Sequence, residues 1–150
     1  LLKEIKKLLA ENNEIYEFNA RAGILPIRSL ETLNSSDAIV LAFPLYIDSL
    51  PSHFLRFLEA LEIYFKANEN HNIRVYAISN CGFYEGEQNR IALKIIENWC
   101  HKCDLIFAQG LGIYASINYP RRLYIFQGNN SWTSVARKNG LKKKDIYSLG

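Results

Sequence analysis

The feature that most constrains the fold of this chain is an unbroken apolar run that follows Asp37 and ends at Phe43, just before Pro44. Such a run is typical of a strand buried on both faces of a parallel sheet. A second apolar strand is predicted over 73–79 and a third over 105–114, the latter interrupted by two glycines. Parallel strands need long connections, which are usually helices. The chain should therefore carry helices between these three segments.

Helical periodicity fills both intervals. Pro51 suits the first turn of a helix, and Ser49 is its predicted cap. The apolar face predicted for this helix comprises Phe54, Leu55, Leu58, Leu61, Ile63, Tyr64 and Phe65. A long helix is predicted over 87–101, with the apolar residues Ile91, Leu93, Ile95, Ile96 and Trp99. This alternation of strands and helices predicts a doubly wound α/β sheet.

The flanking segments are less regular. Leu1–Glu11 has the spacing of an amphipathic helix, 14–19 alternates as a strand does, and 29–34 is predicted to be a short helix. Residues 123–138 are predicted to be at least partly helical. Three apolar residues lie near this end of the chain: Trp132, Val135 and Leu141. They could form a dimer contact or a lid, but we favour ordinary packing of an amphipathic helix.

Composition narrows the class of protein. A chain of 150 residues that is 49% hydrophobic is expected to form one domain, and it has no apolar run of about eighteen residues that could span a membrane. Three cysteines without a secretory signal favour a cytoplasmic location. Residues 1–116 carry a net charge of −3 and 117–150 carry +6. We interpret the basic end as a solvated helix end, because no nucleic-acid motif accompanies it.

Ligands of open parallel sheets bind beyond the carboxyl ends of the strands. Three loops are predicted there: Pro44–Ser49, 80–87 and 112–116. The first two place Tyr46, Phe83 and Tyr84 beside proline or glycine. Exposed rings are costly unless a flat apolar ligand covers them, and Gly82 and Gly86 would let it approach the backbone. The alternative is that these rings fold back onto the core of the protein. We favour the interpretation that a ligand covers them.

These segments carry a family resemblance. Asp37–Pro51 resembles the third strand and following loop of the flavodoxin-like NAD(P)H-dependent FMN reductases. Val75–Gly86 is similar to their fourth strand and flavin-facing loop, and 99–112 to the helix end and fifth strand that follow. The resemblance implies a flavodoxin-like sheet of order 2-1-3-4-5. It also implies an FMN site with Pro44, Leu45, Tyr46 and Ile47 on one side of the ring, and Asn80, Cys81, Gly82, Phe83 and Tyr84 at its pyrimidine edge and other face.

The activity implied by this resemblance is hydride transfer from NADH or NADPH to bound FMN, followed by electron delivery to a small-molecule or flavin acceptor. The cofactor carries this chemistry, so no catalytic side chain is required. We expect no nucleic-acid or membrane partner, and we favour a homodimer. Two alternatives stay open: a flavodoxin-type electron carrier, and a cofactor-free interaction module with the same fold. Such carriers tend to be strongly acidic, whereas this chain has a net charge of +3, which favours the reductase.

The chain departs from the family pattern at its start. The family begins with a central strand and a hydroxyl-rich phosphate loop, whereas Leu1 already lies in the helix that follows that loop. We therefore expect 1–150 to be a single flavodoxin-like domain that lacks this strand and loop and is also incomplete near 27–28 and 115–117. A sheet of that order without its first strand would have a slot lined by unpaired backbone groups.

Other constellations are weaker. Cys100-His-Lys-Cys103 has the spacing of a metal or redox pair, but a structural zinc site needs four ligands. A phosphatase loop at Cys81 would need an arginine at position 87, which is glutamate. Magnesium could be bound by the carboxylates of Glu85, Glu87 and Asp48. We favour a helix-capping role for the two glutamates and a loop-tethering role for Asp48. We therefore predict no metal site.

Overall fold

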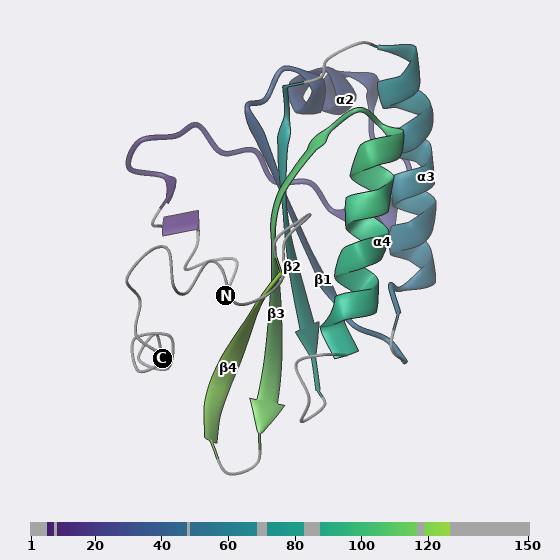
Figure 1. The fold of residues 1–150 in the computed structure, drawn as a ribbon. Helices are drawn as coiled ribbons and strands as arrows, with labels where there is room; N and C mark the ends of the chain where they lie inside the picture. Colours follow the sequence, from purple (N-terminus) through teal and green to yellow (C-terminus); the bar gives the residue numbers. More distant parts are fainter. Residues whose placement is uncertain are drawn as a thin grey trace.

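A computed structural model of the chain describes residues 6–7, 9–47, 49–68, 72–82, 88–116 and 119–126. The elements in chain order are the 3-10 helix η1 (Ala20–Ala22), α2 (Ile27–Asn34), β1 (Ala38–Pro44), α3 (Ser52–Ala67), β2 (Arg74–Cys81), α4 (Asn89–Lys102), β3 (Ile106–Ser116) and β4 (Tyr119–Phe126) (Figure 1). The three predicted strands and the two predicted crossover helices are confirmed.

The strands form one sheet of order β1-β2-β3-β4. β2 pairs with β1 and β3 in parallel, and β3 pairs with β4 in antiparallel orientation. Helices α3 and α4 lie side by side over one face of this sheet (Figure 1). The predicted α/β class is therefore correct, and β1, β2 and β3 have the order expected for strands 3, 4 and 5 of a flavodoxin-like sheet.

Strand β1 lies at the edge of the described sheet, and its side chains alternate between buried and exposed positions. Ile39, Leu41 and Phe43 are buried, whereas Val40 is 39% exposed. The prediction that this strand is buried on both faces was therefore wrong, because α3 and α4 cover only one face. Residues 14–19, predicted as a strand, are irregular. The slot expected within the sheet does not arise in the described part of the chain.

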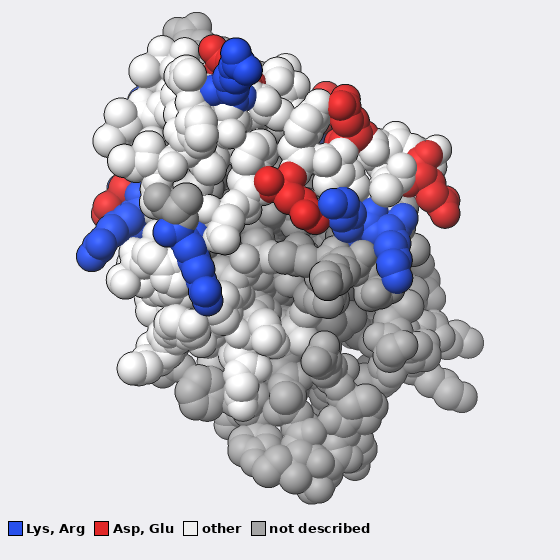
Figure 2. Space-filling view, turned by 180° about the vertical axis from the view of Figure 1, so that it is seen from behind, with Lys and Arg blue, Asp and Glu red and all other residues white. Residues whose placement is uncertain are grey.

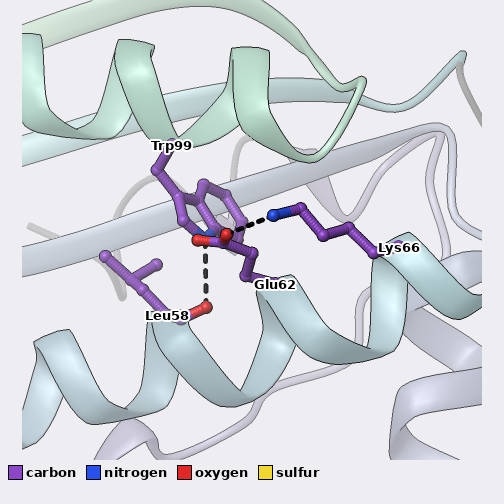
Figure 3. Close-up of polar contacts among 4 residues, drawn as sticks. All are labelled: Leu58, Glu62, Lys66 and Trp99. Carbon is purple, nitrogen blue, oxygen red and sulfur yellow. Dashed lines mark hydrogen bonds and ion pairs between the residues drawn. The ribbon is translucent and has the colours of Figure 1, made fainter.

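The core between the sheet and the two helices is rich in rings. Phe43 stacks on Phe54 at 4.9 Å between ring centroids, and Phe65 meets Trp99 edge-on at 6.3 Å. The indole Nε1 of Trp99 donates a hydrogen bond of 3.0 Å to the carbonyl oxygen of Leu58 (Figure 3). This bond satisfies the buried indole N–H and joins α4 to α3, so the two helices pack as one layer.

Predictions at three single positions and in two segments need correction. Ser49 does not cap α3, because that helix has Pro51 at its N-cap position and no side-chain cap bond. Ile63 and Ile91 are exposed, since each lies on the side of its helix opposite the buried stripe. The loop predicted over 112–116 and the helix predicted from 123 are strands, because β3 extends to Ser116 and pairs with β4.

The ends of the chain are only partly described. Lys6, Lys7 and Leu9 are helical, as predicted, whereas 1–5 and position 8 lie outside the described residues. The same holds for 127–150, which includes most of the last predicted helix and the basic end.

Helix length and surface charge bear on whether the chain has a membrane or a nucleic acid as a partner. None of the helices in the described ranges is long and apolar enough to cross a membrane. On the face seen in Figure 2, basic and acidic side chains are interspersed, with uncharged surface between them. The described residues therefore present no basic patch on this side.

Candidate functional site

The first two predicted ligand loops meet at the carboxyl ends of β1 and β2. Since these strands are parallel neighbours, Pro44 and Asn80 lie in register at the ends of their strands. One residue further along the chain, the backbone N–H of Leu45 donates a hydrogen bond of 2.8 Å to the carbonyl oxygen of Asn80. The two loops are thus side by side and directly joined.

The loop after β1 forms a narrow turn. The backbone N–H of Tyr46 donates to the carbonyl of Ser49 at 2.9 Å, and the N–H of Ser49 donates back to the carbonyl of Tyr46 at 3.1 Å. Between them Ile47 adopts a positive φ of 44°, which is costly for a β-branched residue. Tyr46 is 52% exposed and Ile47 is 91% exposed. The turn therefore directs two large apolar side chains outward.

The loop after β2 offers an open backbone. Asn80 and Gly82 are exposed, and a Cβ atom added at Gly82 would meet no atom of the described residues within 4 Å. Phe83 and Tyr84, which the family resemblance implies at the flavin, lie outside the described residues. The same holds for Asp48, Glu85, Gly86 and Glu87. In the described part of this loop, the backbone of Asn80 and Gly82 is therefore exposed.

The remaining predicted site residues contribute differently. Pro44 is exposed at the end of β1. Leu45 and Cys81 are buried, and both side chains belong to the core. Any ligand in this position would therefore contact the backbone of these two residues and not their side chains.

A buried polar contact lies beneath the second loop. The side-chain nitrogen of Asn89, the first residue of α4, donates a hydrogen bond of 3.1 Å to the Cys81 sulfur. A Cβ atom at Gly112 would lie only 2.8 Å from the Asn89 Cβ. Sequence reasoning missed Asn89, although a glycine inside an apolar strand is a signal of close approach. Nearby along β2, the buried Ser79 hydroxyl has no hydrogen-bond partner among the described residues.

The two cysteines at the other end of α4, Cys100 and Cys103, are buried free thiols. Burial raises the pKa of Cys100 to about 12, and burial with the nearby Glu62 carboxylate raises the pKa of Cys103 to about 12. This shift disfavours the thiolate, which is the nucleophilic form of cysteine. In the described part of the chain, no group of three or more His, Cys, Asp and Glu side chains could hold a metal ion.

Comparison with known proteins finds likenesses among solved structures. No protein-family model and no curated protein matches the chain. The fold is similar to a crystal structure of an NADPH-quinone reductase from P. pentosaceus, with a TM-score of 0.46 and 16% sequence identity. The match covers 76% of this chain and 72% of that one. At this level of similarity, the function has to be argued from the site itself.

Proposed function

We propose that this chain binds FMN between the loops that follow β1 and β2, and that it acts as an NAD(P)H-dependent oxidoreductase. The observation that carries the proposal is the exposed turn of Tyr46 and Ile47 beside the open backbone at Gly82. A strained turn that exposes large apolar side chains is unfavourable in water, so a flat apolar ligand over it would lower the free energy of the complex.

The residues around this position fit an isoalloxazine ring. Tyr46 offers an aromatic surface on one side, and the backbone at Asn80 and Gly82 offers polar groups on the other. The Leu45–Asn80 hydrogen bond holds the two sides together before any ligand arrives, and such preorganisation favours affinity.

The chain would supply binding and orientation. Bound FMN supplies the redox chemistry, in which hydride comes from NADH or NADPH and electrons pass to a small-molecule or flavin acceptor. Backbone N–H groups of the second loop would stabilise negative charge that develops on the reduced ring. Leu45 and Cys81 would act through the backbone, because their side chains are buried.

Two measurements on the wild-type chain test the proposal. FMN fluorescence should be quenched on titration with the protein, because a stacked ring loses emission. Anaerobic addition of NADH or NADPH should then bleach the visible absorption of the flavin. Quenching without bleaching would instead indicate an electron carrier. Absence of quenching would overturn the proposal and favour the cofactor-free interaction module.

A Gly82→Val substitution locates the site. Since nothing lies within 4 Å of a Cβ at Gly82, the fold should accept the larger side chain, whereas the ligand would lose its approach to the backbone. We expect FMN affinity to fall about tenfold or more, which corresponds to ~1.4 kcal/mol. The matched control is Ala67→Val, at the exposed end of α3 away from the site. Equal FMN affinities of the two variants would contradict this placement of the ring.

A further inference from the structure

We infer that Asn89 is a positioning residue for the candidate site, acting through Cys81 on the loop that would face the flavin. The inference rests on the proposed function for its ligand, but the geometry that carries it is independent of any ligand. Asn89 begins α4, and Cys81 ends β2 immediately before Gly82. A contact between these two side chains therefore connects the helix to the loop.

The contact is buried and specific. Asn89 is fully buried, and its side-chain nitrogen donates to the Cys81 sulfur at 3.1 Å. The Cys81 side chain is also buried, so water does not compete for this bond. The bond thus fixes the end of β2 from the helix side.

The strand on the other side restricts Asn89 further. A Cβ at Gly112 of β3 would lie 2.8 Å from the Asn89 Cβ, 3.0 Å from its Cγ and 3.1 Å from its side-chain nitrogen. The Asn89 side chain therefore rests directly against the backbone of β3, in space that a larger residue at position 112 would occupy. This packing limits the directions in which the amide can point and keeps it toward Cys81.

These contacts hold the second loop from two sides. The Leu45 N–H holds the carbonyl of Asn80 from β1, and Asn89 holds Cys81 from α4. Gly82, the next residue, is the open position proposed to face the ring. Loss of the Asn89 bond should therefore loosen the end of β2 at Cys81 and Gly82 while the rest of the fold stays intact.

Thiol labelling of an Asn89→Ala variant without ligand tests this inference. Cys100 and Cys103 are buried elsewhere on the same chain, so they serve as internal controls in mass-spectrometric detection. We expect Cys81 to be labelled about tenfold faster than in the wild type, the size expected for one hydrogen bond, with the other two thiols unchanged. Equal acceleration of all three thiols, or of none, would overturn the inference.

Replacement of the acceptor provides a second test that leaves Asn89 in place. Cys81→Ser keeps an acceptor for the Asn89 amide, whereas Cys81→Ala removes it. We expect the alanine variant to bind FMN about tenfold more weakly than the serine variant, with an absorption spectrum shifted relative to it. Equal affinities would overturn the positioning role. If the wild type itself binds no FMN, the proposed function fails, and the labelling result alone decides the role of Asn89.

Discussion

A Gly112→Ala substitution is the sharpest test of the packing beneath the candidate site. The new methyl group would lie 2.8 Å from the Asn89 Cβ, closer than carbon atoms pack in folded proteins. This Cβ is attached to the backbone of α4, so a change of side-chain rotamer cannot move it away. Relief requires that the start of α4 or the end of β3 shifts.

The cost can be worked from this geometry. Overpacking in a closed core destabilises by ~1–3 kcal/mol, and loss of the Asn89–Cys81 hydrogen bond adds ~1 kcal/mol. Replacement of a strand glycine by alanine stabilises the fold by ~0.5–1 kcal/mol, because the unfolded chain has less conformational entropy. We therefore expect the free energy of unfolding to fall by ~2 kcal/mol, which for a chain of this size lowers Tm by roughly 4–8 °C.

Two glycines of the same chain provide graded controls in thermal and urea denaturation. At Gly110 the added Cβ would lie 3.1 Å from the Leu93 Cδ2, the end of a flexible side chain, so Gly110→Ala should cost less. At Gly82 it would meet nothing within 4 Å, and Gly82→Ala should be nearly neutral. Wild-type stability of Gly112→Ala, or a smaller loss than for Gly110→Ala, would refute the reasoning.

Three further predictions concern stability. Because burial raises the pKa of Cys100 and Cys103 to about 12, the folded chain keeps protons that the unfolded chain releases above pH 9, so stability should fall as pH rises from about 9 toward 12. Urea titrations of the Cys100→Ala/Cys103→Ala variant should show a shallower fall, and an identical slope would contradict this cause. Trp99→Phe removes the bond to Leu58 and should cost ~1–3 kcal/mol in urea denaturation, whereas an unchanged midpoint would show that the bond contributes nothing. Ile47→Gly relieves the positive φ at an exposed position and should raise the free energy of unfolding by roughly 0.5 kcal/mol, so a loss of stability would contradict strain there.

The regular elements were predictable because each has a strong local signal. Apolar runs locate β1, β2 and β3, and helical periodicity locates α3 and α4. The prediction that β1 is buried on both faces failed, because burial depends on which elements pack against the strand. The run in β1 is typical of a strand covered on both sides, but the pattern within one strand does not reveal which faces the helices cover.

Other predictions were wrong because two local structures compete for the same residues. Residues 123–126 have apolar spacing that a helix would also satisfy, but their pairing with β3 supplies backbone hydrogen bonds that make them a strand. Ser49 has a good capping side chain, yet its backbone is held opposite Tyr46 in the turn, two residues too early for the helix.

The meeting of the two loops at the ends of β1 and β2 was predictable, whereas the contacts beneath them were only partly so. Rings beside proline and glycine at strand ends marked Tyr46 and Gly82 as candidates, and the structure leaves both exposed. That Leu45 and Cys81 turn inward, and that Asn89 supports the loop, depends on side-chain packing between elements distant along the chain. In the sequence, Gly112 was the signal that indicated a close approach of Asn89 to β3.

The parallel pairing described above also determines how such a chain must assemble. Ala38 pairs with Arg74, and Arg74 pairs with Ile106, so each parallel contact joins positions at least about thirty residues apart. Contacts of this range make folding slow, because a long loop must close before the contact is gained. Each intervening helix shortens that loop once it has formed, so its stability should influence the folding rate. Substitutions at the α3–α4 contact of Trp99 would then slow refolding as well as weaken the native state.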